Sequence, residues 1–258
     1  MPRISETIPA VILDWAGTTV DQGCMAPVLA LQSVLARHSI RTSAEELRVG
    51  MGLPKRDHLR SVLSHHGLIE MTDVLYPELE RELMVQIAAR TELISGVASV
   101  TAWLRAEGVL IGTTTGYSRA MIELIAAAAA RQGYRPDAII TPEDVSAGRP
   151  SPLMIYANAL RLGVWPLGRL VKVGDTPSDI TEGRNAGVWT IGVALTGNSL
   201  GLTEPEIQRL PSGDRSACFS AARSALLAAG AHDVIDVLPE LPEALARIAR
   251  YLGEGRRP

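Results

Sequence analysis

The segment AVILDWAGTTVD, residues 10–21, joins an apolar run to residues that can do chemistry. Asp14 ends the run, and the residues that follow it are small and hydroxyl-bearing. This arrangement suits a carboxylate nucleophile held at the end of a buried strand. Enzymes that use an aspartate in this way usually carry a second acid two positions later, which protonates the leaving group. Here that position is Ala16, so the leaving group must depart without such an acid.

A lysine offers another route. When its amine forms an imine with a carbonyl, electrons from a breaking bond can enter the iminium, which serves as an electron sink for a carbanion. Lys55 lies in VGMGLPKRDHLR, residues 49–60, where two glycines and a proline predict a tight loop. It is one of two lysines in the chain, and the other, Lys172, lies within an expected strand. A loop lysine is most often a solvated surface residue, but the missing acid at position 16 favours a catalytic role.

An imine-forming lysine must be partly neutral, because only the free amine attacks a carbonyl. Burial under a closed cap, or a neighbouring cation such as Arg56 or His58, would lower the pKa of Lys55. We therefore expect this lysine to have a lower pKa than an exposed one.

The elements that would position these residues alternate along the second part of the chain. Short apolar runs at 109–115, 137–144, 170–176 and 189–197 are separated by helical patterns at about 97–107, 118–132, 152–162 and 179–186. This alternation predicts βαβ units and a parallel sheet, with residues 10–13 as a further, central strand. Ligands bind beyond the carboxyl ends of such strands. We therefore expect Asp14, Thr114–Thr115 and Asp175 to converge there.

Residues 22–99 have a different hydrophobic pattern, which predicts several helices and no convincing strand. We predict an α/β protein whose Rossmann-like core, residues 1–21 and 100–258, has a parallel sheet with helices on both faces. Residues 22–99 would form an inserted α-helical cap domain. Residues 198–258 are expected to add helices and loops that complete the core.

Composition and charge exclude several classes of protein. The formal net charge of −3 gives no reason to expect nucleic-acid binding. No apolar run approaches the roughly 20 residues that span a bilayer, so no membrane association is expected. The N-terminal sequence lacks the apolar segment of a signal peptide. Cys24 and Cys218 stand far apart in no metal-ligand spacing, which fits a reducing cytoplasm better than secretion.

Four ordered motifs resemble the haloacid-dehalogenase-like superfamily of phosphoryl-transfer enzymes. They are DWAGT at 14–18, the Thr115 end of IGTTTG, Arg149 in AGRPSP, and GDTPSD at 174–179. Alone, a strand-terminal aspartate is more often a helix cap, and an arginine can be a solvated loop charge. The ordered set favours function, because a phosphate flanked by carboxylates needs a nearby cation. Asp179 is expected to cap the following helix and to tune the metal site.

A narrower pattern closely resembles the phosphonoacetaldehyde hydrolase family over nearly the whole chain. It comprises DWAGTTVDQGC, MGLPKRDH, TTGY, AGRP and VGDTPSDITEGRNAG, and the MGLPK segment separates this family from its relatives. The resemblance implies Asp14 as the nucleophile, Lys55 as the Schiff-base residue, and one Mg²⁺ per subunit held by Asp14, the Ala16 carbonyl and Asp175. It also implies a small-molecule substrate, phosphonoacetaldehyde, cleaved to acetaldehyde and phosphate, and a homodimer formed through cap helices.

Three residues are expected to assist the chemistry. Thr115 should hydrogen-bond a phosphoryl oxygen. His58 should help with proton transfer, unless it is only a partly exposed helix residue. Tyr117 should contact substrate, unless it merely begins a helix.

Three more are expected to shape the site. Met51 and Gly52 should form the loop that presents Lys55, although methionine is more often core filler. Cys24 should pack or line the site rather than act covalently, since no basic partner is adjacent.

Two other functions stay open. A generic phosphatase or phosphomutase of the same fold would act on small phosphate esters. A non-catalytic phosphate-binding protein would keep the scaffold, although the set Asp14, Thr115, Arg149 and Asp175 argues against it.

Overall fold

The computed structural model describes residues 3–258. Within this range six parallel strands form one sheet in the order β3-β2-β1-β4-β5-β6. The strands are β1 (Ala10–Leu13), β2 (Leu110–Thr114), β3 (Ala138–Ile140), β4 (Val171–Gly174), β5 (Trp189–Val193) and β6 (Asp233–Ile235). The expected α/β class is confirmed, and residues 10–13 form a central strand as predicted.

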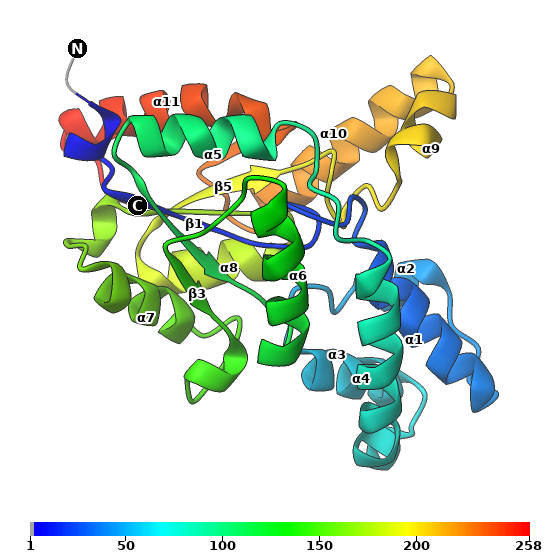
Figure 1. Cartoon of the computed structure of the whole chain (residues 1–258). Coiled ribbons are helices and arrows are strands. Elements are labelled where there is room, and N and C mark those ends of the chain that lie inside the picture. The colour runs from blue at the N-terminus through cyan, green and yellow to red at the C-terminus, as the bar shows by residue number, and fades with distance from the viewer. Residues whose placement is uncertain (1–2) are drawn as a thin grey trace.

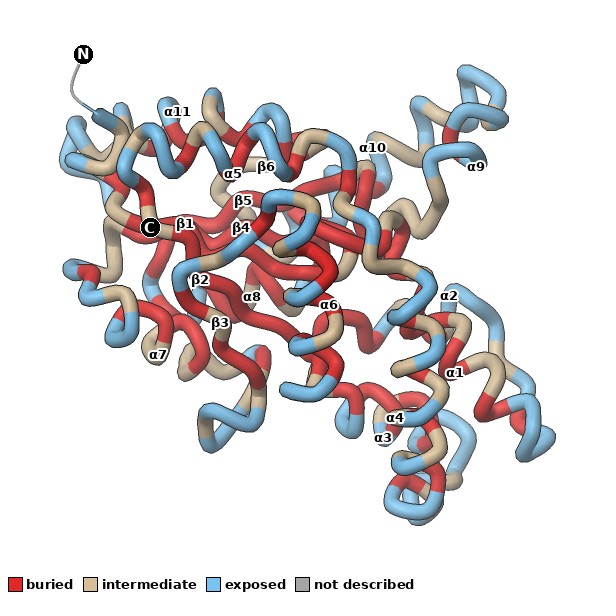
Figure 2. The backbone as a smooth tube through the Cα atoms, viewed as in Figure 1, coloured by how far each residue is buried: buried red, intermediate tan, exposed pale blue. Residues whose placement is uncertain are grey.

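The central strand is apolar along its whole length because both of its faces are covered. Successive side chains of a strand point to opposite faces. In β1, Val11 and Leu13 join the larger hydrophobic core, whereas Ala10 and Ile12 pack in a second core with Ile155. Figure 2 shows the sheet as a buried layer inside helices whose outer surfaces are exposed.

Helices flank both faces of the sheet (Figure 1). On one side lie α5 (Val97–Ala106) and α11 (Leu241–Gly253), which contact β2 and β6 respectively. On the other side α7 (Leu153–Leu162), α8 (Pro177–Ala186) and α10 (Ser212–Ala228) pack on the strands. The remaining helices after residue 106 are α6 (Arg119–Arg131), α9 (Glu204–Arg209) and the short 3₁₀ turns Pro142–Asp144, Leu167–Arg169 and Leu238–Glu240.

A group of helices from residues 22–99 lies beside the sheet (Figure 1). It consists of α1 (Met25–Arg37), α2 (Ala44–Arg48), α3 (Lys55–His65) and α4 (Thr72–Ala88), with α1 packed on α4. We keep the name cap for residues 22–99; its status as a separate domain stays a prediction. The predicted boundary at residue 100 falls inside α5, which begins at Val97.

Two segments differ from expectation. The stretch 198–258 contains β6 as well as helices and loops. This edge strand is three residues long, and its sequence, DVI, is too short to show a period. The expected strand at 137–144 is confined to β3, because Pro142 begins a 3₁₀ turn. Among the described residues, no helix has the length and apolarity required to cross a bilayer.

Candidate active site

Asp14 follows β1 directly and is buried, with 5% of its surface exposed. Its backbone N–H donates to the Val173 carbonyl of the neighbouring strand, which fixes it at the carboxyl edge of the sheet. Burial and the nearby Asp179 carboxylate raise the pKa of Asp14, while Arg149 and Lys172 oppose this shift. The carboxylate therefore depends on positive charge around it to stay ionised.

Arg149 supplies part of that charge from the loop before α7. Its Nη2 lies 2.8 Å from Asp14 Oδ1, its Nη1 2.9 Å from Asp179 Oδ1, and its Nε 3.0 Å from Glu182 Oε2. The side chain is almost fully buried. The neighbouring carboxylates raise the pKa of Arg149, so this guanidinium is permanently charged. It is no solvated loop charge.

Three buried carboxylates fit a divalent cation. Asp14, Asp175 and Asp179 each place an oxygen within 4.8 Å of the others. Burial and the other two carboxylates raise the pKa of Asp175 to about 8, which is the behaviour expected of buried acids that lie close together. Oxygen ligands of this kind suit hard cations.

Asp14 and Asp175 are better placed than Asp179 to hold that cation. Asp179 Oδ1 already lies 2.8 Å from Lys172 Nζ, and its Oδ2 accepts from Thr176. With Thr176 it forms a capping box at the start of α8, as its expected capping role requires. The Ala16 carbonyl lies near Asp175, because the Cys24 thiol is within hydrogen-bond distance of both, at 3.3 Å and 3.2 Å.

The Cys24 thiol is a hydrogen-bond donor rather than a nucleophile. Burial and the nearby carboxylates of Asp175 and Asp21 raise its pKa, so it stays protonated. Cys24 has a left-handed backbone conformation, φ 51°, at the residue before α1. Its position agrees with the expected packing and lining role.

Lys55 begins α3 and faces inward, with only 6% of its surface exposed. Its Nζ lies 4.9 Å from the centroid of the Tyr117 ring. Burial lowers the pKa of Lys55 to about 8, the Arg149 charge acts in the same direction, and the acidic groups oppose it. The lysine is thus neutral often enough at pH 7 to act as a nucleophile.

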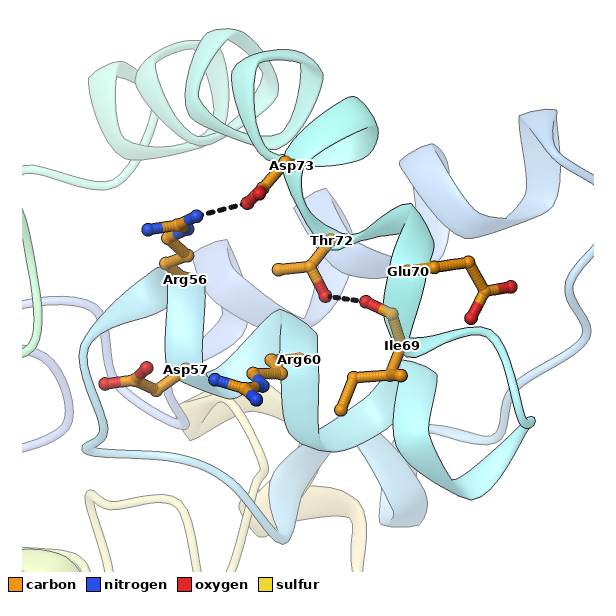
Figure 3. Close-up of a pocket in the computed structure, with 7 residues that line it drawn as sticks. All are labelled: Arg56, Asp57, Arg60, Ile69, Glu70, Thr72 and Asp73. Carbon is orange, nitrogen blue, oxygen red and sulfur yellow. Dashed lines mark hydrogen bonds and ion pairs between the residues drawn. The ribbon is translucent and has the colours of Figure 1, made fainter.

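Arg56 and His58 do not cause this shift. The Arg56 side chain is exposed and pairs with Asp73 at the pocket drawn in Figure 3, between α3 and the start of α4. His58 is fully buried, and burial lowers its pKa to about 3, so it carries no charge at neutral pH. The idea that His58 is a partly exposed helix residue is wrong.

His58 instead supports the loop that carries the lysine. Its Nε2 lies 2.7 Å from the Leu47 carbonyl, and its ring fills the space beside Gly50. Residues 49–54 form a tight loop, as expected. The loop packs directly on the core at Gly116, on the turn after β2. There is no room for a side chain at this glycine, because a Cβ would lie 2.3 Å from the Leu53 carbonyl oxygen. This backbone-to-backbone contact positions Lys55.

Residues from both parts of the chain line one small cavity. The space between its atoms is about 260 Å³. The lining includes Asp14, Ala16, Cys24, Met51, Gly52, Lys55, Thr115, Tyr117 and Arg149. Asp175, Asp179 and His58 are not in the lining. The geometry therefore brings a buried amine and a buried carboxylate to the same enclosure.

Thr115 and Tyr117 lie on the turn that follows β2. Thr115 Oγ1 accepts the Tyr117 backbone N–H at 3.1 Å. The buried Tyr117 hydroxyl has no hydrogen-bond partner within the described chain. A buried hydroxyl of this kind usually finds a partner, so it is available to a ligand.

Sequence reasoning missed Lys172 and Glu182. Both are fully buried, and both contact Thr114: its Oγ1 receives a hydrogen bond from Lys172 Nζ at 2.9 Å and donates to Glu182 Oε2 at 2.9 Å. Glu182 also accepts from Arg149. The signal that could have found them is Lys172 itself, a charged residue inside an expected buried strand. A buried lysine without a partner is costly, so an acidic partner such as Glu182 should lie nearby.

The parallel sheet and the buried carboxylates Asp14, Asp175 and Asp179 are the fold and candidate site of a hydrolase. A family model for haloacid dehalogenase-like hydrolases matches residues 8–187, and the chain belongs to that family. Within it, the chain is 41% identical to the phosphonoacetaldehyde hydrolase of Syntrophobacter fumaroxidans, over 97% of this chain and 95% of that protein. It is 42% identical to that of Bacillus cereus, over 94% and 97%. This protein is therefore a member of the phosphonoacetaldehyde hydrolase group.

A solved structure supports the same grouping. The crystal structure of a phosphonoacetaldehyde hydrolase-like protein from Oleispira antarctica matches with a TM-score of 0.95 and 35% identity. The match covers 98% of this chain and 96% of that one.

Proposed function

We propose that this protein hydrolyses the carbon–phosphorus bond of phosphonoacetaldehyde, giving acetaldehyde and phosphate. One observation carries the proposal: Lys55 and Asp14 line the same small cavity, while the position of the usual second acid is Ala16. The similarity to phosphonoacetaldehyde hydrolases over nearly the whole chain supports the substrate.

The neutral Lys55 amine attacks the aldehyde carbon, and loss of water gives an iminium. The Asp14 carboxylate then attacks phosphorus. The C–P electron pair moves into the iminium and leaves an enamine, so no free carbanion forms and no acid at position 16 is needed. Arg149, 2.8 Å from Asp14, offsets the negative charge that collects as the carboxylate and phosphonate approach each other.

The enamine carbon takes up a proton, and water releases acetaldehyde and the free lysine. A further water hydrolyses the aspartyl phosphate and restores Asp14. The water lost in iminium formation is regained, so the net reaction consumes one water. The Lys55 amine lies over the Tyr117 ring, and Thr115 provides a hydroxyl for a phosphoryl oxygen.

Asp14, Asp175 and the Ala16 carbonyl are the residues that would hold Mg²⁺, which when bound supplies positive charge between the anionic carboxylate and phosphonate. The buried oxygens around Asp175 support this assignment.

Phosphate release from phosphonoacetaldehyde, measured with and without EDTA beside a panel of small phosphate esters, tests the activity. We expect release from the phosphonate that EDTA abolishes, and little from the esters. A generic phosphatase or phosphomutase would show the reverse preference. A non-catalytic protein would release none, although membership in a hydrolase family argues against that function.

Borohydride treatment with substrate tests the route. We expect a covalent adduct on Lys55, located by mass spectrometry. Lys172 is the internal control, because it is fully buried in ion pairs. An active enzyme without an adduct at Lys55 would exclude the imine.

We also propose a homodimer formed through cap helices, working in the cytoplasm. Val74 and Val85 are 71% and 64% exposed and lie on one face of α4, since eleven residues make just over three full turns. Exposed apolar groups on one helix face suit an interface. Sedimentation of the wild type and of the variant with both valines changed to lysine tests this.

The free cysteines Cys24 and Cys218 agree with a reducing compartment.

A further inference from the structure

Arg48, the last residue of α2 in the cap, reaches across to the core. Its Nη1 donates to the Gly23 carbonyl at 2.7 Å and to Asn198 Oδ1 at 3.1 Å, and its Nη2 donates to the Gly201 carbonyl at 3.0 Å. One planar side chain thus contacts the first residues of the cap and the loop after β5.

Asn198 returns the contact. Its Nδ2 donates to the Arg48 carbonyl oxygen at 3.0 Å, and the same oxygen accepts the Met51 backbone N–H at 3.1 Å. Asn198 is 7% exposed, so these hydrogen bonds are shielded from water. The pair is therefore reciprocal, and it ends at the first turn of the lysine-bearing loop.

The other side of Asn198 faces the acidic cluster. Its backbone N–H donates to Asp175 Oδ2 at 2.7 Å. A continuous set of contacts thus runs from Met51 through Arg48 and Asn198 to Asp175. The Arg48 guanidinium is packed so closely on Gly201 that a Cβ there would lie 2.6 Å from its Cζ.

We propose that Arg48 and Asn198 form a clasp that holds the lysine-bearing loop, residues 49–55, against the acidic cluster and so positions Lys55 for the reaction. The clasp rests on the proposed function, in which Lys55 must meet a substrate bound at Asp14. Both are positioning residues, because neither lines the cavity. The clasp closes the cap at the point where its loop and the core meet.

Two variants open the clasp from opposite sides. Arg48→Gln removes the guanidinium contacts, and Asn198→Ala removes both side-chain contacts while its backbone N–H stays on Asp175. Arg60→Gln is the matched control, since Arg60 is an exposed cap arginine on α3 (Figure 3). If one variant fails to fold, the other still tests the proposal.

Hydrogen exchange of residues 49–55 is the readout that does not depend on activity. We expect each clasp variant to exchange about tenfold faster there, with the double variant little faster than either single one, because contacting residues are not additive. If residues 49–55 exchanged at the wild-type rate in both single variants, the clasp would be overturned.

Borohydride trapping of acetaldehyde at Lys55 tests positioning. In the clasp variants the loosened loop should let water reach the Lys55 amine. The pH midpoint of trapping should then move from about 8 toward the ordinary lysine value. The groups facing the amine are Tyr117, Cys24, Asp14, Arg149 and Asp175, and the variants leave all of them intact. A lower melting temperature with an unchanged midpoint would mean a structural role only and would overturn the proposal. If wild-type protein is never trapped, the imine route fails instead, and the exchange data still decide the clasp.

Discussion

Lys55 lies over the ring of Tyr117 at the wall of a cavity that also holds Asp14. The cap supplies the amine and the core supplies the ring and the carboxylate. The ring shields the amine from water, and burial brings its pKa to about 8. At pH 7 about one amine in ten is then neutral, roughly 300-fold more than for an ordinary lysine.

Reductive trapping of acetaldehyde at Lys55 should therefore rise with pH and level off above about 8. The direction follows from the lowered pKa, because the neutral, reactive form accumulates as pH passes the folded-state value. Mass-spectrometric adduct yield against pH measures it. A midpoint near 10.5 would show that the amine is exposed.

Replacing Lys55 should abolish C–P cleavage. Lys55→Ala removes the amine, and Lys55→Arg fails as well because a guanidinium stays protonated. We expect kcat/KM to fall by about a thousandfold or more in both variants. Circular dichroism and melting curves control for misfolding; appreciable turnover by folded Lys55→Arg would contradict the imine.

Ala16→Asp should shift the reaction toward phosphate esters. The new carboxyl would supply the missing proton donor for an alkoxide leaving group, an effect worth about a hundredfold or more where geometry is ideal. It would also add negative charge beside Asp175. We expect ester hydrolysis to rise about tenfold and phosphonate cleavage to fall. Ala16→Ser is the control, since it adds a polar group without an acid.

Lys172→Met should strongly destabilise the fold. It leaves Asp179 and Glu182 buried with one cation fewer, and breaking a buried ion pair costs about 3–5 kcal/mol. The double variant Lys172→Met with Glu182→Gln removes one charge of each sign and should lose less than the sum of the single changes. Urea unfolding measures both. Additive losses would mean that the two residues act independently.

Magnesium should stabilise the protein more at pH 8 than at pH 6. The folded-state pKa of Asp175 is raised from 3.8 to about 8, so its contribution to stability is present below the unfolded value and is lost as pH rises through about 8. A cation that neutralises the ionised cluster regains this loss. Melting temperatures with Mg²⁺ and with EDTA at both pH values test it, and Asp175→Asn should remove the difference.

The place of Asp14 at the end of a central strand of a parallel sheet could be predicted because it depends on a local pattern. Asp14 ends an apolar run, Asp175 ends another, and the topology of a parallel sheet brings such ends together. Lys55 could be singled out because lysines are rare in this chain and Ala16 leaves a chemical gap.

The supporting contacts could not be predicted in the same way. Arg48 and Asn198 are separated by 150 positions, and neither belongs to a periodic pattern. The burial of His58 depends on how α3 packs against the Leu47 carbonyl, which its own sequence spacing does not reveal. The edge strand β6 exists because β5 offers it a partner.

The fit of Gly116 beneath the loop carbonyls gives a way to sort relatives. Any side chain at that place would lift the cap loop and withdraw its amine from Asp14. A homologue that keeps a lysine at the position of Lys55 but carries a bulky residue at the position of Gly116 should therefore fail to cleave a carbon–phosphorus bond. A steric feature of two backbones, rather than a reactive group, then marks which lineages can break a carbon–phosphorus bond.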